Sequence, residues 1–224
     1  MKIIQFKSNE KATPFAPEWS YYIGEANIND WYAHKPDWKV ITNYLLKKEK
    51  EILELPKTNK VISDGYTGLG DNSITSRHGS FNLFDISKFK NIELEKLKFA
   101  ILNRFEEFLN DLNMKKPKNL YVQCWYNVMR KGDKIEKHIH GTDENSYLGC
   151  HVCVQSNNTN TYYINSINQI NDPLEHKSKN EQGKITFFSS CLPHYTDTHM
   201  ADEERITIAM DLSLKSEENF IKVW

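Results

Sequence analysis

The sequence has few of the features that direct a protein to or across a membrane. Its apolar runs, such as Tyr44–Leu46 and Ile185–Phe188, fall far short of the roughly 20 residues that span a bilayer. The opening MKIIQFKSNEK holds no extended apolar core followed by a small-residue cleavage site, so it does not look like a secretory signal. We therefore expect a soluble protein of the cytoplasm.

The chain also lacks an excess of charge of either sign. Its 29 Lys and Arg residues face 30 Asp and Glu residues, which leaves a formal net charge of −1. No overall field therefore favours nucleic acid or an anionic membrane as a partner, although a local basic patch would still permit nucleic acid. Homodimer formation is left open.

Cysteine is scarce, and only Cys150 and Cys153 among the 4 cysteines have a spacing that resembles a motif. The pair lies in LGCHVCV, which has the composition of a strand. Side chains at i and i+3 of a strand point to opposite faces, so these thiols do not easily share a metal or form a redox pair. We expect both to be reduced and unligated.

The 224 residues fit a single domain, 1–224, without an internal repeat or a long linker. Its first part, 1–118, is predicted to be helical and irregular. Apolar residues recur at near-helical spacing over 37–55 and, more strongly, over 91–114. Between them, the polar and glycine-containing stretch 63–82 predicts a surface loop over or near a pocket.

The pattern changes to short strands with turns over 119–214, followed by a tail, 215–224. Around eight strands in about 95 residues are typical of a jelly roll or another closed β-sandwich. The fold class is therefore α+β, mainly β, with the N-terminal helices packed against the sheet. The predicted strands are 120–129, 135–140, 147–155, 160–165, 184–190, 194–200 and 205–214, with a further one near Pro173 to His176.

Three histidines of this β region form a candidate metal site. His138 and His140 are two apart, which on a strand places both imidazoles on one face, about 7 Å apart at Cα. His194 follows a later strand and a proline, from where a returning strand can bring it opposite that pair. Three imidazoles with open positions suit iron(II), zinc or copper. The alternative is that each histidine is an ordinary core or surface residue.

Arg205 begins the last strand, where Thr207 shares its face. At the mouth of a β-barrel, the planar guanidinium would bind a carboxylate through two hydrogen bonds, and the Thr hydroxyl would add a third. The alternative is a surface Arg205 paired with Glu203 or Glu204.

Together these segments resemble a known family. CWYNVMRKGDKIEKHIHGTDENSYLGCHVCV, followed by GKITFFSSCLPHYTDTHMADEERITIAMDLSL, is similar to the 2-oxoglutarate and iron(II)-dependent oxygenases of bacteria and tailed phages. The shared pattern is an H-x-H segment, a distal His, and Arg-x-Thr/Ser about ten residues later. The resemblance covers roughly Leu120 to Leu214 and, more loosely, the helix 91–114.

The resemblance implies a double-stranded β-helix of the cupin-like jelly-roll type, in which His138 and His194 bind iron and Arg205 with Thr207 binds the distal carboxylate of 2-oxoglutarate. Asn127 is a further candidate to hydrogen-bond the co-substrate. The usual family pattern is H-x-D/E, so His140 is a departure. Either His140 completes a three-histidine site, or Asp143 supplies the carboxylate, or water takes that place; we favour His140.

The activity implied is that of an Fe(II) and 2-oxoglutarate-dependent dioxygenase, which couples decarboxylation of 2-oxoglutarate to succinate with hydroxylase-type oxidation of an unidentified substrate. The small-molecule co-substrate is then the one partner that can be named. Such an enzyme would work in the cytoplasm, or in the host cytoplasm if a phage encodes it. Two alternatives are a cupin-like three-histidine dioxygenase without 2-oxoglutarate and a non-catalytic β-sandwich binding or structural protein.

Overall fold

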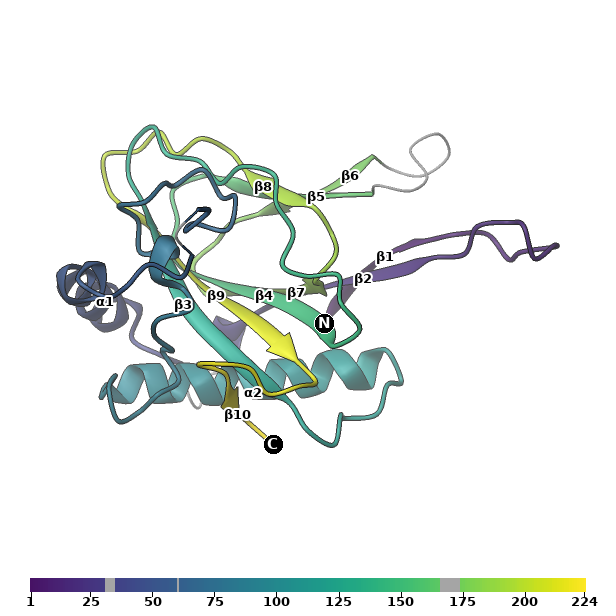
Figure 1. The fold of residues 1–224 in the computed structure, drawn as a ribbon, viewed down its shortest axis with the longest axis horizontal. Coiled ribbons are helices and arrows are strands. Elements are labelled where there is room, and N and C mark those ends of the chain that lie inside the picture. Colours follow the sequence, from purple (N-terminus) through teal and green to yellow (C-terminus); the bar gives the residue numbers. More distant parts are fainter. Residues whose placement is uncertain (31–34, 60, 166–173) are drawn as a thin grey trace.

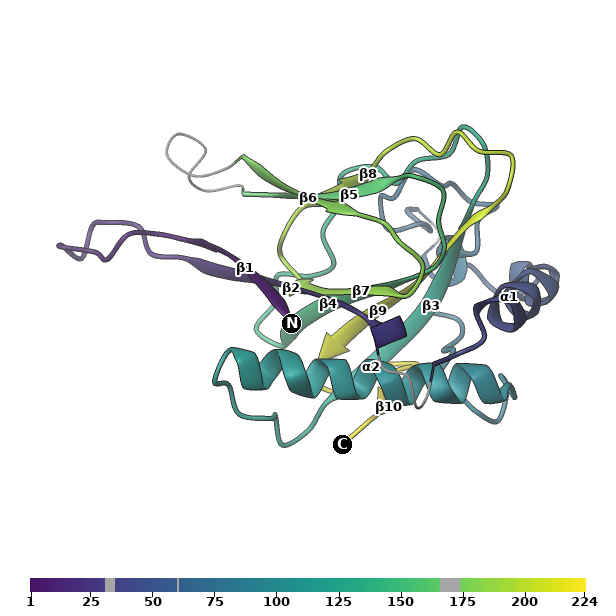
Figure 2. The ribbon, with the colours of Figure 1, turned by 180° about the vertical axis from the view of Figure 1, so that it is seen from behind.

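The computed structural model describes residues 1–30, 35–59, 61–165 and 174–224, in which two antiparallel sheets are accompanied by two α-helices (Figure 1, Figure 2). The helices are α1 (Trp38–Leu53) and α2 (Ile92–Asp111), with short 3₁₀ helices η1 (Ile28–Asp30) and η3 (Thr75–Arg77). The strands are β1 (Lys2–Lys7), β2 (Ser20–Asn27), β3 (Tyr121–Met129), β4 (Ser146–Gln155), β5 (Asn160–Ile164), β6 (Glu175–Lys179), β7 (Lys184–Ser189), β8 (His194–Thr196), β9 (Arg205–Ser213) and β10 (Ile221–Lys222).

The two sheets form the jelly roll that the strand pattern predicts. The larger sheet has the order β1-β2-β7-β4-β9-β3-β10, and the smaller has the order β6-β5-β8. Both views show the smaller sheet lying across one face of the larger, with α2 along the opposite face (Figure 1, Figure 2). The α+β, mainly β fold class is thus confirmed.

Both predicted helices are present, and each begins at a capping side chain. The Asp37 carboxylate accepts hydrogen bonds from two backbone N–H groups at the start of α1, and the Asn91 side chain does the same for α2. The apolar stripe of α2 packs on the large sheet, where the Phe108 ring stacks on Phe187 of β7 with 5.6 Å between centroids. The helices therefore cover the outer face of the sheet and leave its inner face for the pocket.

Strand β9 shows how the core and the pocket are separated. Alternate side chains on one face of β9 are buried in the main hydrophobic core, which the helices share: these are Ile206, Ile208, Met210 and Leu212. Burying each such side chain contributes about 1.5–3 kcal/mol to folding. The residues between them point toward the smaller sheet, because side chains of a strand alternate between its faces.

Several elements differ from the sequence prediction. The segment before α1 contributes β1 and β2, which extend the large sheet beyond β7, and the C-terminal tail contributes β10, which pairs with β3. Residues 135–140 were predicted as a strand, but this prediction is wrong: the segment forms only an isolated bridge between His138 and His194. Strand β6 begins at Glu175, whereas Pro173 lies outside the described residues.

Two predictions drawn from absences are tested by the described residues. None of the helices in these ranges has the length and apolarity needed to cross a bilayer. All four cysteines are free thiols, and both Cys150 and Cys153 are buried in β4, as expected for structural cysteines.

Candidate metal and co-substrate site

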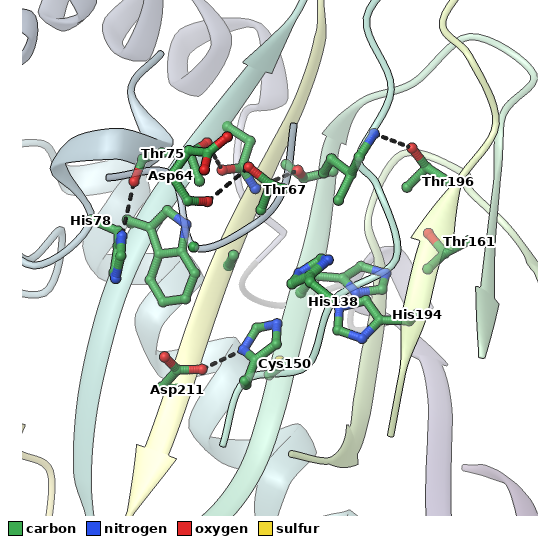
Figure 3. Close-up of a pocket in the computed structure, with 18 of the residues that line it drawn as sticks. Asp64, Thr67, Thr75, His78, His138, Cys150, Thr161, His194, Thr196 and Asp211 are labelled. Atoms are coloured by element: carbon green, nitrogen blue, oxygen red, sulfur yellow. Dashed lines mark hydrogen bonds and ion pairs between the residues drawn. The ribbon is translucent and has the colours of Figure 1, made fainter. Parts of the chain in front are cut away.

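The three predicted histidines converge at one end of the space between the sheets. His138, His140 and His194 each offer a ring nitrogen, and these nitrogens all lie within 4.8 Å of one another. The ring centroids of His138 and His194 are 4.3 Å apart, and those of His140 and His194 are 5.0 Å apart. Figure 3 shows the His138 and His194 rings facing the same small volume. This geometry allows one metal ion to contact all three imidazoles.

Backbone hydrogen bonds hold the H-x-H segment against the start of β8. The His138 amide donates to the His194 carbonyl at 3.1 Å, and the His194 amide donates back to the His138 carbonyl at 3.0 Å. The His140 amide donates to the Ser190 carbonyl at 2.9 Å. Extended backbone with this bridge keeps the two-residue periodicity of a strand, so both imidazoles still point to one side.

The outer nitrogen of each imidazole has an acceptor of its own. Nδ1 of His138 lies 2.8 Å from the Glu136 carbonyl, and Nδ1 of His194 lies 3.0 Å from the Leu192 carbonyl. Nδ1 of His140 contacts the Asp211 carboxylate instead. Acceptors at Nδ1 favour the tautomer with its proton on Nδ1, which leaves Nε2 of all three rings free to bind a metal.

The environment also favours neutral imidazoles. Burial, followed by the neighbouring His140, lowers the pKa of His138 to about 4. Burial and the nearby His138 hold the pKa of His194 well below its usual range. Both rings are therefore unprotonated near neutral pH, and the neutral imidazole is the form that binds a metal.

A cavity of about 130 Å³ connects the histidines with the inner face of β9. Alternate residues of β9 line it along its length: Arg205, Thr207, Ala209 and Asp211. The volume is below the roughly 300–1,000 Å³ of pockets for drug-sized ligands. It suits a compact ligand that reaches from the histidines toward Arg205.

Arg205 is buried in this cavity without an anion beside it. Its side chain is 2 % exposed, and among the described residues no carboxylate pairs with it. Nη1 lies 2.7 Å from the Met129 sulfur, a weak acceptor, while Nε has no hydrogen-bond partner in the described chain. The alternative of a surface Arg205 paired with Glu203 or Glu204 is therefore wrong. A buried and unpaired cation is costly, and a bound carboxylate would offset that cost.

The other two predicted co-substrate residues lie beside Arg205. Asn127 and Thr207 are paired across β3 and β9, both are buried, and the Asn127 amide lies 3.5 Å from the Thr207 hydroxyl. The Asn127 side-chain oxygen accepts a hydrogen bond from Thr75 at 2.5 Å. Thr75 belongs to the loop 63–82, which lines the cavity as predicted, together with Asp64, Gly65, Thr67 and His78.

The structure separates the two candidates for the third ligand. Asp143 lies on an exposed loop, where its carboxylate accepts hydrogen bonds from Asn145 and Ser146, and it is not part of the histidine cluster. His140 is in the cluster, and its ring lies near Phe188 and Trp125. The geometry therefore favours His140.

Sequence reasoning missed several polar residues of the cavity, among them Asp211 and His151. Asp211 contacts His140. It lies four residues after Thr207 and therefore on the same face of β9, so strand periodicity could have identified it. His151 lies on β4, its Nδ1 is 3.2 Å from the Tyr163 hydroxyl, and burial lowers its pKa to about 3. Its Nε2 has no partner among the described residues. No motif marked His151 in advance.

Comparison with known proteins agrees with this geometry. A family model described as "Putative 2OG-Fe(II) oxygenase" matches residues 123–211, which run from β3 to near the end of β9 and include all three histidines and Arg205. This segment is therefore similar to the 2OG-Fe(II) oxygenases. The name of this family indicates enzymes that use Fe(II) as cofactor and 2-oxoglutarate as co-substrate. A search of curated protein sequences found no match.

One solved structure supports the likeness in fold, and two others match with lower TM-scores. A prolyl hydroxylase from Trichoplax adhaerens, in complex with a peptide fragment of a hypoxia inducible factor oxygen degradation domain, superposes with a TM-score of 0.52 at 9% identity, over 85% of this chain and 83% of that one. A prolyl-4-hydroxylase from Pseudomonas putida has a TM-score of 0.47 at 11% identity, over 87% and 93% of the two chains. A Burkholderia pseudomallei oxidoreductase of the 2OG-Fe(II) oxygenase family has a TM-score of 0.39 at 15% identity. This match covers 49% of this chain and 51%, about half, of that protein.

The residues present fit both groups that the family requires. Three free Nε2 atoms within one small volume form a set of nitrogen donors suited to a divalent metal. The unpaired guanidinium at the other end of the cavity is suited to a carboxylate.

Proposed function

We propose that His138, His140 and His194 bind Fe(II), and that Arg205 with Thr207 and Asn127 binds the distal carboxylate of 2-oxoglutarate, so that the protein works as a dioxygenase of the hydroxylase type. The observation that carries this proposal is the buried and unpaired Arg205 in the same cavity as the three histidines. A metal site alone would not need a buried cation beside it.

When bound, Fe(II) and 2-oxoglutarate supply the oxidising chemistry, which couples decarboxylation of 2-oxoglutarate to oxidation of a substrate. The chain's own residues bind and orient these groups. Arg205 and Thr207 hold one end of the dicarboxylate, which leaves its keto acid end directed toward the histidines. Phe188, whose ring lies 4.6 Å from that of His194, provides an apolar wall that excludes water beside the metal.

The alternative hypothesis, a three-histidine dioxygenase without 2-oxoglutarate, does not explain why Arg205 is buried in the cavity. In such an enzyme, we would expect an apolar side chain at this position or a neighbouring carboxylate. The position of Arg205 inside the cavity, away from Glu203 and Glu204, therefore favours the 2-oxoglutarate-dependent reaction.

Charge and cysteine content support two further inferences, one about the substrate and one about the location of the protein. The near-neutral formal charge of −1 disfavours duplex nucleic acid as the substrate. The four free thiols are typical of a reducing compartment, and so we also infer a cytoplasmic location.

The proposal is tested by anaerobic titration of the Fe(II)-loaded protein with 2-oxoglutarate, following the charge-transfer absorption expected for this family. A charge-assisted bidentate pair is worth about 1.5–3 kcal/mol. Replacement Arg205→Ala should therefore weaken 2-oxoglutarate binding by roughly ten- to a hundredfold. Because Arg205 is not a metal ligand, Fe(II) affinity should change much less.

Arg130→Ala provides a matched control. Arg130 is largely exposed and pairs with Glu49 outside the cavity, so its removal should leave 2-oxoglutarate affinity unchanged. Absence of the absorption band in the unmodified protein, or equal affinity in Arg205→Ala, would contradict the proposal.

A further inference from the structure

Among the residues that the structure describes, Asp211 is the one carboxylate that forms a hydrogen bond or ion pair with the histidine cluster. It lies on the cavity face of β9, and its Oδ1 accepts the hydrogen bond of His140 Nδ1. The corresponding nitrogens of His138 and His194 bond to neutral backbone carbonyls. His140 is therefore the only ring of the three with an anionic partner, and it occupies the position where the family pattern has a carboxylate.

We propose that Asp211 is a positioning residue that supplies, through the His140 imidazole, the negative charge that an H-x-D/E site places directly on the metal. This inference rests on the proposed metal site. In the usual arrangement of two histidines and one carboxylate, the carboxylate cancels part of the charge of Fe(II). Three neutral imidazoles cancel none of it, whereas a carboxylate hydrogen-bonded to Nδ1 makes the imidazole a more basic, electron-rich ligand.

The surroundings of Asp211 leave its charge available for this task. Among the described residues, no Lys or Arg pairs with Asp211, and its ion-pair contact is with His140. Its side chain is 29% exposed and lines both the histidine cavity and a second cavity, which water can enter. The carboxylate is therefore in contact with solvent on one side, and its Oδ1 is directed at the His140 imidazole on the other.

Packing positions the His140 ring independently of Asp211. The Phe188 ring meets it edge-on with 5.2 Å between centroids, and the Trp125 ring lies 5.9 Å away. The His140 amide is also bonded to the Ser190 carbonyl at 2.9 Å. Removing only the charge of Asp211 should thus leave the His140 ring in place. The change should affect the basicity of the imidazole as a ligand, and the geometry of the site should be preserved.

The test compares metal affinity in Asp211→Asn and in the unmodified chain, by chelator competition with Co(II) and Zn(II) as probes that oxygen does not alter. Asn keeps the size of the side chain and one oxygen acceptor but lacks the charge. We expect affinity to fall by about 10- to 100-fold, the range typical of such outer partners. The ligand-field absorption of the Co(II) form should shift as well, which a purely structural role would not cause.

Asp143→Asn is the matched control, because Asp143 is a carboxylate of the same second cavity without contact to a histidine. It removes the same formal charge, and affinity and Co(II) spectrum should stay unchanged. If Asp143→Asn lost as much metal affinity as Asp211→Asn, the inference would be overturned. The loss would then reflect the removal of any nearby negative charge, without a role for the hydrogen bond to His140.

A double-mutant cycle tests whether Asp211 acts through the imidazole. In a His140→Asp background, which restores the usual pattern, Asp211→Asn should change metal affinity by less than about threefold, because no imidazole N–H remains to be polarised. A loss of equal size in both backgrounds would refute the role through His140.

His194→Ala separates this inference from the proposed function. If His194→Ala keeps full affinity for Co(II) and Zn(II), the metal site itself is wrong. If His194→Ala abolishes binding while Asp211→Asn binds like the unmodified chain, the metal site stands and the role of Asp211 is refuted.

Discussion

Glu25 and Arg205 are both charged side chains buried within the sheets, yet their surroundings differ. Glu25, on β2, lies 3.0 Å from the His176 ring and 3.1 Å from the Lys184 ammonium, with Lys2 at 3.5 Å. Arg205, on β9, has no ionic partner among the described residues. A charge that serves the fold is paired within the chain, whereas a charge kept for a ligand is left unpaired at a cost in stability.

The largest expected effect on stability is at the paired charge. Glu25→Gln leaves Lys184 and His176 without their anion, so we expect the free energy of unfolding at pH 7 to fall by about 2–3 kcal/mol. Urea denaturation monitored by circular dichroism measures it. The exposed carboxylate Glu18, paired with Lys11, offers the control: Glu18→Gln should change stability by less than about 0.5 kcal/mol.

The same pair predicts a pH dependence. Burial alone would raise the pKa of Glu25, but the hydrogen bond with His176, the nearby Ser178 hydroxyl and the Lys184 ammonium outweigh it and hold the pKa well below its usual range. A depressed pKa adds stability above the unfolded value, about 4.3, and this contribution is lost as the pH falls below it. The stability difference between the unmodified chain and Glu25→Gln should therefore narrow between pH 6 and pH 3; a constant difference would contradict the pairing.

Substitution of the unpaired Arg205 should raise the free energy of unfolding, whereas substitution of the paired Glu25 should lower it. Arg205→Met replaces a buried cation without an anion by an apolar side chain, so we expect the ligand-free protein to become more stable by about 1–2 kcal/mol. With metal present in both proteins, 2-oxoglutarate at a hundredfold excess over the Kd of the unmodified chain should stabilise that chain by about 2.7 kcal/mol, but should stabilise Arg205→Met, with its roughly ten- to hundredfold weaker binding, by only about 0.4–1.4 kcal/mol. A ligand-free Arg205→Met protein less stable than the original would show that Arg205 serves the fold, as Glu25 does.

The contrast also explains which features were predictable from the sequence. The strands between 119 and 214 follow from local alternation, and the inner face of β9 follows from the two-residue spacing of Arg205 and Thr207. The three histidines lie together although 135–140 is not a regular strand, because the extended backbone around the bridge to His194 keeps the same periodicity; their role as metal ligands stays a prediction.

Features that depend on pairing distant in sequence were missed. Strands β1 and β2 have mixed burial. Strand β2 pairs with β7, more than 150 positions later, and β1 pairs with β2, so no local pattern reveals them. Asp211 was reachable by counting two further steps along β9, but a carboxylate that acts through another residue belongs to no spacing motif. Glu25 and His176 likewise meet only when β2 and β6 are brought together.

The smallest expected effect concerns Thr207, an uncharged residue beside Arg205. Its hydroxyl is 3.5 Å from the Asn127 amide, a long contact that leaves it free to donate to a carboxylate held by Arg205. Thr207→Val keeps the shape and removes one hydrogen bond, worth about 0.5–1.5 kcal/mol, so 2-oxoglutarate affinity should fall by roughly two- to tenfold. The anaerobic titration measures this loss, and Thr207→Ser, which keeps the hydroxyl, should recover most of it. If Thr207→Val binds 2-oxoglutarate as tightly as the unmodified chain, the hydroxyl makes no contact with the co-substrate, and the anion site consists of Arg205 without Thr207.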